Sequence, residues 1–197
     1  MSEPEVAGSD IYLQPAVTLE QGRRYLVCAR SGHGKSSLLN FIYGGSRRYD
    51  GKIEMEGMED VSQERMRREV LSYMFQDLRL FAQLTAAENV LLKNRLTDYK
   101  SGGEIERMLD ALLPSEKKRQ PVGTLSLGQQ QRVAAVRALC QPFAFLLLDE
   151  PFSHLDNESA AMVSQLMVEE AEKQHAGIIL TSLGMNDNIR FDRIFKL

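Results

Sequence analysis

The fold is decided by Phe145-Leu146-Leu147-Leu148-Asp149-Glu150-Pro151, an apolar run that ends in two carboxylates and a proline. Continuous apolar runs of this length are typical of strands that are covered on both faces, as in parallel sheets. A buried carboxylate is costly unless a cation lies beside it. The stretch therefore predicts a buried strand whose carboxyl end holds a cation, although two exposed carboxylates that cap a strand before Pro151 are the alternative.

A second stretch, Ser31-Gly32-His33-Gly34-Lys35-Ser36, lies between a predicted strand at residues 25–29 and a predicted helix that begins at Lys35. Its glycines allow the backbone to bend so that consecutive N–H groups point at a phosphate, and the following helix adds its positive end. Lys35 is expected to neutralise phosphate oxygens, and the Ser36 hydroxyl is expected to contact Mg²⁺. The phosphate-binding residues predicted here are Ser31, Gly32, His33, Gly34, Lys35, Ser36 and Ser37.

Ala29 stands where the phosphate-loop pattern G-x-x-x-x-G-K-[ST] usually has its first glycine, so this loop alone is also compatible with an ordinary strand-to-helix turn. The carboxylates that end the apolar run make a phosphate site the better interpretation. Asp149 is then expected to hold Mg²⁺ through water, and Glu150 is expected to orient or deprotonate the attacking water.

Composition limits the possible functions. The chain has 197 residues, of which 43% are hydrophobic, and this suits one domain or one domain with a small appended lobe. A net charge of -3 argues against nucleic acid as a partner, because a phosphate backbone requires a basic surface. Cys28 and Cys140 lie in apolar stretches without metal-ligand spacing, and we expect two buried, reduced thiols.

The sequence indicates neither a secretion signal nor a membrane span. Residues 1–5 are acidic and lack the basic-then-apolar order of a secretion signal. The longest apolar run, residues 143–148, is far shorter than the ~18 residues that a spanning helix requires. We expect a cytoplasmic protein that lies on the cytoplasmic face of a membrane only through a partner.

Hydrophobic patterning divides the chain into alternating strands and helices. Strands are predicted at residues 17–19, 25–29, 51–57, 71–75, 143–148 and 177–181. Helical segments are predicted at residues 35–42, 62–69, 84–113, 128–139 and 157–173, with a break at 101–103 and a loop at 114–123. This order implies an α/β fold with a mainly parallel core sheet. We expect a single domain over residues 1–197, with a core at about 1–76 and 125–197 and an α-helical lobe at about 77–124.

Residues 125–132 complete a set of motifs. They read Leu125-Ser126-Leu127-Gly128-Gln129-Gln130-Gln131-Arg132, which resembles the signature L-S-G-G-Q-Q-Q-R of the ATP-binding cassette (ABC) ATPases at seven of eight positions. The phosphate loop, Gln76, the Asp149-Glu150 strand end and the Ser153-His154-Leu155-Asp156 turn stand in the family's order. Residues 75–90 and 191–197 are similar to the lipoprotein-release, macrolide-export and cell-division group of cassettes, the latter matching their last core strand.

This resemblance implies a P-loop NTPase fold with a short N-terminal β portion and an inserted helical lobe. It implies an ATPase that uses ATP and Mg²⁺ and that forms a head-to-tail dimer with a second ABC ATPase subunit, identical or different. It further implies that ATP-driven dimerisation powers an integral-membrane transporter subunit, which is a separate chain. The transported substrate and the direction of transport stay open.

The resemblance also implies roles for individual residues. Gln76 would reach Mg²⁺ and the attacking water, so that Gln76 and Glu150 are the catalytic residues. The implied metal-binding residues are Ser36, Gln76 and Asp149. The signature residues Ser126, Leu127, Gly128 and Gln129 would contact the ATP of the opposite subunit, and Asp156 would cross the dimer interface.

Three positions depart from the family pattern. Ser182 stands where the family has a histidine that contacts the γ-phosphate, and the loss of a charge-stabilising group commonly costs about 10²-fold or more in rate. Leu127 replaces a glycine, and its side chain would either crowd the facing γ-phosphate or lie on the helix flank. Tyr12 is the candidate for stacking on adenine, against the alternative of an ordinary strand aromatic.

These departures support a rival function. A cassette that dimerises on ATP but hydrolyses it weakly would act as a regulatory or scaffolding module. The altered Ser182 and Leu127 favour this alternative, whereas the intact Glu150 favours an energy-coupling ATPase.

Overall fold

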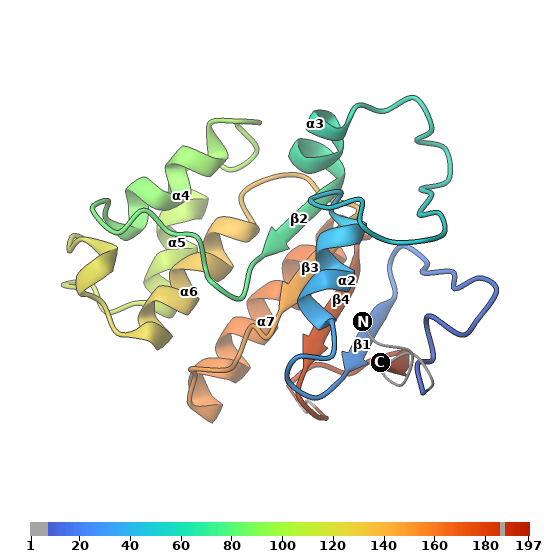
Figure 1. The fold of residues 1–197 in the computed structure, drawn as a ribbon. Helices are drawn as coiled ribbons and strands as arrows, with labels where there is room; N and C mark the ends of the chain where they lie inside the picture. The colour runs from blue at the N-terminus through green and yellow to red at the C-terminus, as the bar shows by residue number, and fades with distance from the viewer. Residues whose placement is uncertain (1–7, 186–187) are drawn as a thin grey trace.

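The computed structural model describes residues 8–185 and 188–197, so the acidic opening at residues 1–5 lies outside it. Its centre is a five-stranded sheet in the order β2-β3-β4-β1-β5, in which every paired strand is parallel (Figure 1). The strands are β1 (Arg24–Cys28), β2 (Leu71–Met74), β3 (Phe145–Asp149), β4 (Gly177–Ser182) and β5 (Arg193–Lys196). The expected α/β class with a mainly parallel sheet is confirmed.

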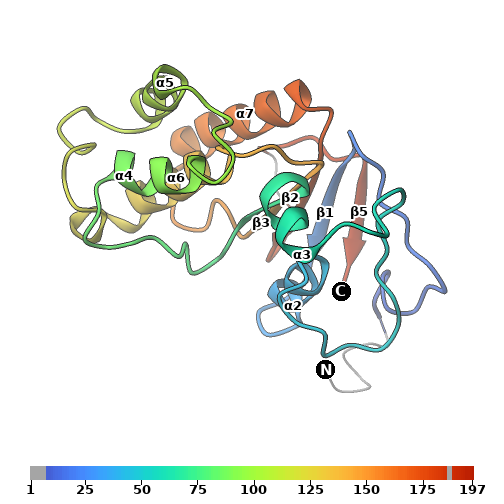
Figure 2. The same ribbon diagram turned by 90° about the horizontal axis from the view of Figure 1, so that it is seen from above.

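Helices cover both faces of this sheet (Figure 2). The helical segments are α2 (Lys35–Ile42), α3 (Gln63–Arg65), the π-helix η1 (Met66–Val70), α4 (Ala86–Asn94), α5 (Gly102–Leu112), the 3-10 helix η2 (Val122–Thr124), α6 (Leu127–Ala138) and α7 (Asn157–Lys173). Because strand side chains alternate between faces, Leu147 and Ile179 pack with Leu39 of α2, whereas Leu146 and Ile178 belong to the core on the α6 and α7 face.

The lobe helices α4 and α5 pack against α6. Each begins with a capping box: Thr85 and Glu88 close the first turn of α4, and Ser101 and Glu104 close that of α5. Lobe residues such as Val90 and Leu109 share one buried cluster with Leu146 of the sheet. The break predicted at residues 101–103 is the start of α5, with Ser101 as its N-cap and Gly102 as its first residue. We propose the division into a core and a fused lobe on this basis.

Two strands expected near the N-terminus do not form. Residues 17–19 and 51–57 have no ladder partner, and Ile53 is exposed. A strand requires a neighbour for its N–H and C=O groups, and alternation in one segment does not supply that neighbour. Within residues 8–57, β1 is the only strand, so the two further strands predicted there are wrong and the short N-terminal β portion consists of β1.

The remaining segments agree closely with the patterning. Helix α2 begins at Lys35 and α7 spans residues 157–173, both as expected. Cys140 is buried and Cys28 is half-buried, and neither forms a disulfide with a described residue. In the part of the chain that the structure describes, no helix combines the length and the apolar character needed to cross a bilayer.

Candidate nucleotide site

The phosphate loop lies between β1 and α2. Gly32 and Gly34 have φ angles of +81° and +84°, which L side chains rarely adopt, so the loop requires glycine at both positions. Gly34 is the N-cap of α2. This turn places residues 31–37 at the positive end of the helix, where backbone N–H groups bind phosphates.

Lys35 is held at the centre of the site. Only 5% of its side chain is exposed, and its Nζ donates to the carbonyl oxygens of Ala29 at 2.9 Å and Arg30 at 3.1 Å. Its Nζ also lies 3.2 Å from Oε1 of Glu150, whose side chain is 13% exposed. The loop and the end of β3 therefore converge on one ammonium group, as phosphate neutralisation beside a catalytic carboxylate requires.

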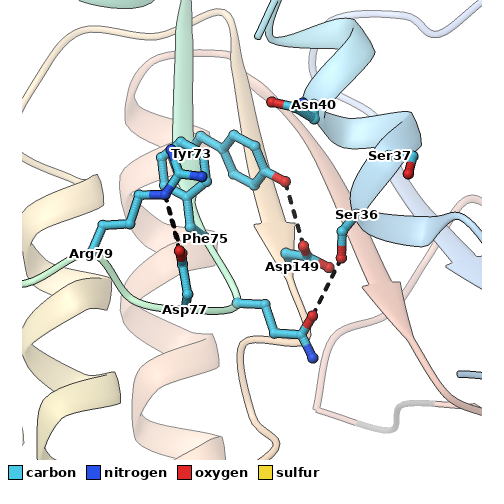
Figure 3. A pocket seen from close by; sticks show the side chains of 9 residues that line it. Ser36, Ser37, Asn40, Tyr73, Phe75, Asp77, Arg79 and Asp149 are labelled. Carbon is cyan, nitrogen blue, oxygen red and sulfur yellow. Dashed lines mark hydrogen bonds and ion pairs between the residues drawn. The ribbon is translucent and has the colours of Figure 1, made fainter. Parts of the chain in front are cut away.

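Side chains that carry oxygen atoms line a hollow beside the start of α2 (Figure 3). The Ser36 hydroxyl donates to Oε1 of Gln76 at 3.3 Å, and both residues line a hollow of about 400 Å³ with Asp149. Hydroxyl, amide and carboxylate oxygens are the ligands that Mg²⁺ prefers, and Mg²⁺ usually takes only one or two carboxylates and completes its shell with water and phosphate. The residues present thus fit a magnesium ion.

Hydroxyl groups from the two neighbouring strands contact the Asp149 carboxylate. Thr181 of β4 donates to Oδ1 at 2.7 Å, and Tyr73 of β2 donates to Oδ2 at 3.4 Å. Asp149 is only 3% exposed, so these hydrogen bonds replace hydration that burial removes. The expected buried strand with a carboxylate at its end is what the structure has.

Glu150 adopts an unusual backbone conformation. Its φ of +49° is in the left-handed region, which is costly for a residue with a side chain and is found at functional sites. Its N–H donates to the Thr181 carbonyl at 3.1 Å, and its own carbonyl accepts from the side chain of Gln131 at 3.1 Å. Gln131 also accepts from the N–H of His154 at 3.0 Å, so one side chain of α6 holds the turn that follows Glu150.

The signature residues form the first turn of α6. The Ser126 hydroxyl accepts from the Gln129 N–H at 3.2 Å, and the Gln129 side chain accepts from the Ser126 N–H at 3.1 Å. Leu127 is 56% exposed and lies on the surface of this turn. A Cβ on Gly128 would lie 2.7 Å from the His154 carbonyl oxygen, so the helix packs closely on the turn that contains His154.

Three other predicted residues have local surroundings of their own. Asp156 is the N-cap of α7, and hydrogen bonds from the N–H and then the hydroxyl of Ser159 lower its pKa. Ser182 ends β4, where its carbonyl accepts from the Ala29 N–H at 3.2 Å beside the phosphate loop. Tyr12 is half-buried against the cluster under α2, and its role in adenine stacking stays a prediction.

The structure brings five predicted residues together: Lys35, Ser36, Gln76, Asp149 and Glu150. It does not bring the signature turn or Asp156 into side-chain contact with them.

Sequence reasoning gave no role to Tyr73, Thr181, Gln131 or Arg137. Arg137 donates to the carbonyls of Leu78 and Arg79, both at 2.6 Å, in the loop after Gln76. A glutamine on the apolar face of a helix, such as Gln131, is a signal that could have been followed.

A glycine loop before a helix, a buried lysine and a strand-end carboxylate define a phosphate-loop nucleotide-binding protein. Residues 13–153 match the ABC transporter family, and the chain belongs to that family. It is 33% identical to the thiamine import ATP-binding protein ThiQ of Escherichia coli strain K12 over 89% of this chain and 76% of that protein. The lipoprotein-releasing system ATP-binding protein LolD of Hydrogenovibrio crunogenus is 28% identical over 100% of this chain and 86% of its own length.

Other comparisons agree with this placement. The macrolide export ATP-binding/permease protein MacB of Aggregatibacter actinomycetemcomitans is 33% identical over 84% of this chain, which spans only 27% of that protein. The dimeric structure of MJ0796, a bacterial ABC transporter cassette, superimposes with a TM-score of 0.81 at 28% identity, over 92% of this chain and 83% of that one. A dimeric post-hydrolysis state of MJ0796 bound to ADP and Pi gives a TM-score of 0.79 at 27% identity.

Proposed function

We propose that this chain is the ATP-binding and ATP-hydrolysing subunit of a membrane transporter, and that ATP-driven dimerisation powers a separate integral-membrane subunit. The observation that carries this proposal is the position of Lys35, which lies 3.2 Å from Glu150 inside a glycine loop at a helix N-terminus. The proposal is supported by relatives whose names describe ATP-binding proteins of import and release systems.

Residues on three elements have separate tasks in this proposal. The N–H groups of residues 31–37 and the Lys35 ammonium bind the phosphates of ATP. Ser36, Gln76 and Asp149 hold Mg²⁺, which when bound neutralises charge on the phosphate oxygens. Glu150 orients the attacking water and accepts its proton, and Gln76 helps to position that water. The left-handed turn at Glu150 and the Gln131 bond fix this carboxylate at the site.

A second cassette supplies the residues that cover the bound ATP from the side opposite the phosphate loop. Ser126 and Leu127 are exposed at the start of α6, so the Ser126 hydroxyl and the N–H groups near Gly128 and Gln129 are proposed to meet the ATP of a second cassette. A hydroxyl that accepts one hydrogen bond still has its hydrogen to donate. The dimeric MJ0796 structures support a paired arrangement. In this proposal Leu127 and Asp156 lie at the interface, and the second subunit is either identical or different.

The relatives also support a cellular location for the protein. A cassette that docks on a transporter subunit lies on the cytoplasmic face of the membrane through that partner. The proposal involves no nucleic acid, in line with the net charge of -3.

We further propose that turnover is slow because the Ser182 hydroxyl can donate only one hydrogen bond and carries no positive charge beside the phosphate loop. Ser182→His is expected to raise steady-state hydrolysis by up to about 10²-fold. Leu127→Gly is expected to strengthen ATP-dependent dimerisation if this side chain crowds the facing phosphate. Rapid hydrolysis by the natural protein that Ser182→His leaves unchanged contradicts the slow-turnover proposal.

The function is tested by steady-state hydrolysis of the protein and its Glu150→Gln form, each analysed for size with and without ATP and Mg²⁺. We expect Glu150→Gln to lower hydrolysis by about 10²- to 10⁴-fold and to accumulate dimers with ATP. Negligible hydrolysis by the natural protein, with intact ATP-dependent dimers, selects the regulatory or scaffolding module favoured by Ser182 and Leu127. Monomers that bind no ATP exclude both functions, and co-purification with a membrane subunit distinguishes the transporter role.

A further inference from the structure

The carboxylate of Asp149 is held from both sides of its strand. Strand β3 lies between β2 and β4, and one hydroxyl on each neighbour reaches Asp149. Thr181 is the direct register partner of Asp149, whereas Tyr73 is paired with Leu147, two residues earlier on the same face. A phenol is long enough to span this offset, and Figure 3 shows the Tyr73 hydroxyl aimed at Asp149.

The Tyr73 ring is fixed by its aromatic neighbours. It stacks on Phe75 with ring centroids 3.9 Å apart, and it meets the edge of Tyr43 at 5.3 Å. Only 9% of the residue is exposed. Ring packing of this kind sets the direction of the phenol and keeps its hydroxyl pointed at the carboxylate.

The chemistry of the two groups makes this hydroxyl the donor. A phenol with an ordinary pKa of about 10 carries its proton at neutral pH, whereas an ionised carboxylate can only accept. A carboxylate oxygen has more than one lone pair, so Oδ1 and Oδ2 can each accept one of these hydrogen bonds and still accept another from a water.

We propose that Tyr73 is a positioning residue for the magnesium site. Its hydroxyl fixes the orientation of the Asp149 carboxylate, so that this carboxylate can accept hydrogen bonds from the water molecules bound to the ion. This inference rests on the proposed nucleotide function. The ring alone fills the space between Tyr43 and Phe75, so phenylalanine would serve the packing equally well. The hydroxyl adds one contact, and that contact is with Asp149.

The test compares Tyr73→Phe with Tyr43→Phe, which removes a phenolic hydroxyl from the same aromatic cluster without touching Asp149. The readout is Mn²⁺ binding, measured by electron paramagnetic resonance in the presence of a non-hydrolysable ATP analogue. We expect Tyr73→Phe to weaken Mn²⁺ binding about ten-fold, as substitutions next to metal ligands do, and Tyr43→Phe to leave it unchanged. Affinity for the analogue without metal is expected to stay the same in both variants.

Thr181→Val provides a second variant on the other side of the carboxylate, and it is expected to weaken Mn²⁺ binding in the same direction. Equal Mn²⁺ affinity in Tyr73→Phe and the natural protein, with the natural protein binding the metal normally, overturns the inference and leaves the proposed function intact. Failure of the natural protein to bind the analogue at all contradicts the proposed function as well.

Discussion

The two halves of the proposed nucleotide site are built in different ways. The inner half, defined as Lys35, Ser36, Gln76, Asp149 and Glu150, is held by contacts between residues far apart in sequence, such as the bond from Ser36 to Gln76. The outward half, defined as residues 126–129 and Asp156, is held by bonds within one helical turn. The inner half is therefore assembled by the fold of one chain, whereas the outward half consists of the capped starts of α6 and α7, which the proposed function directs at a second cassette.

The largest effect is expected from the inner half. Lys35→Met removes the ammonium that three oxygens surround, and the affinity for ATP with Mg²⁺ is expected to fall on the order of 10²-fold. ATP-dependent dimers should be lost with it. Calorimetric titration with ATP checks the affinity, and size analysis checks the dimers. Ser126→Ala, in the outward half, should leave the affinity of the monomer for ATP unchanged. An equal loss of ATP affinity in both variants contradicts the division of the site into an inner and an outward half.

The contact between the first turn of α6 and the turn that links Glu150 to Asp156 is the next most sensitive point. Gly128→Ala places a Cβ 2.7 Å from the His154 carbonyl oxygen, and a backbone atom cannot yield as the end of a side chain can. We expect unfolding free energy to fall by about 1–3 kcal/mol and hydrolysis to fall further, because the turn after Glu150 must shift.

Gly102→Ala is the matched control for this substitution. Gly102 is the first residue of α5, and a Cβ there would meet nothing within 4 Å. Denaturant unfolding should show no loss or a gain of a few tenths of a kcal/mol. If the two variants unfold alike, close packing of α6 on the His154 turn does not stabilise the protein.

Local signals explain which parts of the fold the sequence could predict. The long helical pattern of residues 157–173 predicts α7 at its observed bounds, and the structure adds Asp156 as its N-cap. Residues 51–57 show an equally clear alternation of apolar and charged residues, yet they form no strand. The difference is that a helix satisfies its own backbone, whereas a strand depends on a neighbour that its own sequence does not specify.

The same distinction applies to the site. Motif spacing predicted Lys35, Ser36, Gln76, Asp149 and Glu150, and the structure brings all five together. Tyr73 could not be predicted, because its contact with Asp149 joins residues 76 positions apart. Gln131 is marked in the sequence only as a glutamine on the apolar face of a helix, and its partner, the Glu150 carbonyl 19 positions away, is not. Such contacts depend on strand order and on helix packing, which no short motif records.

A smaller effect is expected from a lysine outside the site. Burial, and then the nearby Arg137, lowers the pKa of Lys93 on α4 to about 8. The unfolded chain holds the Lys93 proton up to a pH near 10.5, whereas the folded chain releases it near pH 8. Below pH 8 the buried charge therefore destabilises the fold in full, and the free energy of unfolding rises with pH between these two values. Lys93→Met should therefore stabilise the protein by roughly 1–2 kcal/mol at pH 7, a gain that shrinks towards pH 10.5.

Lys100→Met is the control for Lys93→Met. Lys100 is buried and lies 2.5 Å from the buried carboxylate of Glu170, so its loss should destabilise the protein at pH 7. Thermal unfolding at pH 7 and pH 10 measures both variants. A Lys93→Met gain that does not depend on pH shows that packing, and not the buried charge, is the cause.

The smallest effect separates stability from assembly in the outward half. Ser126→Ala removes the cap of α6 and should lower the free energy of unfolding by about 1 kcal/mol. Thr85→Ala removes the same kind of cap from α4 and should cost a similar amount. In the Glu150→Gln background, only Ser126→Ala should weaken ATP-dependent dimers, because of the two hydroxyls only that of Ser126 is proposed to contact a second cassette. Equal dimer affinity in the two variants shows that the Ser126 hydroxyl only caps α6. The outward half then contributes backbone N–H groups and a matching surface to the dimer, but no contact from the serine side chain.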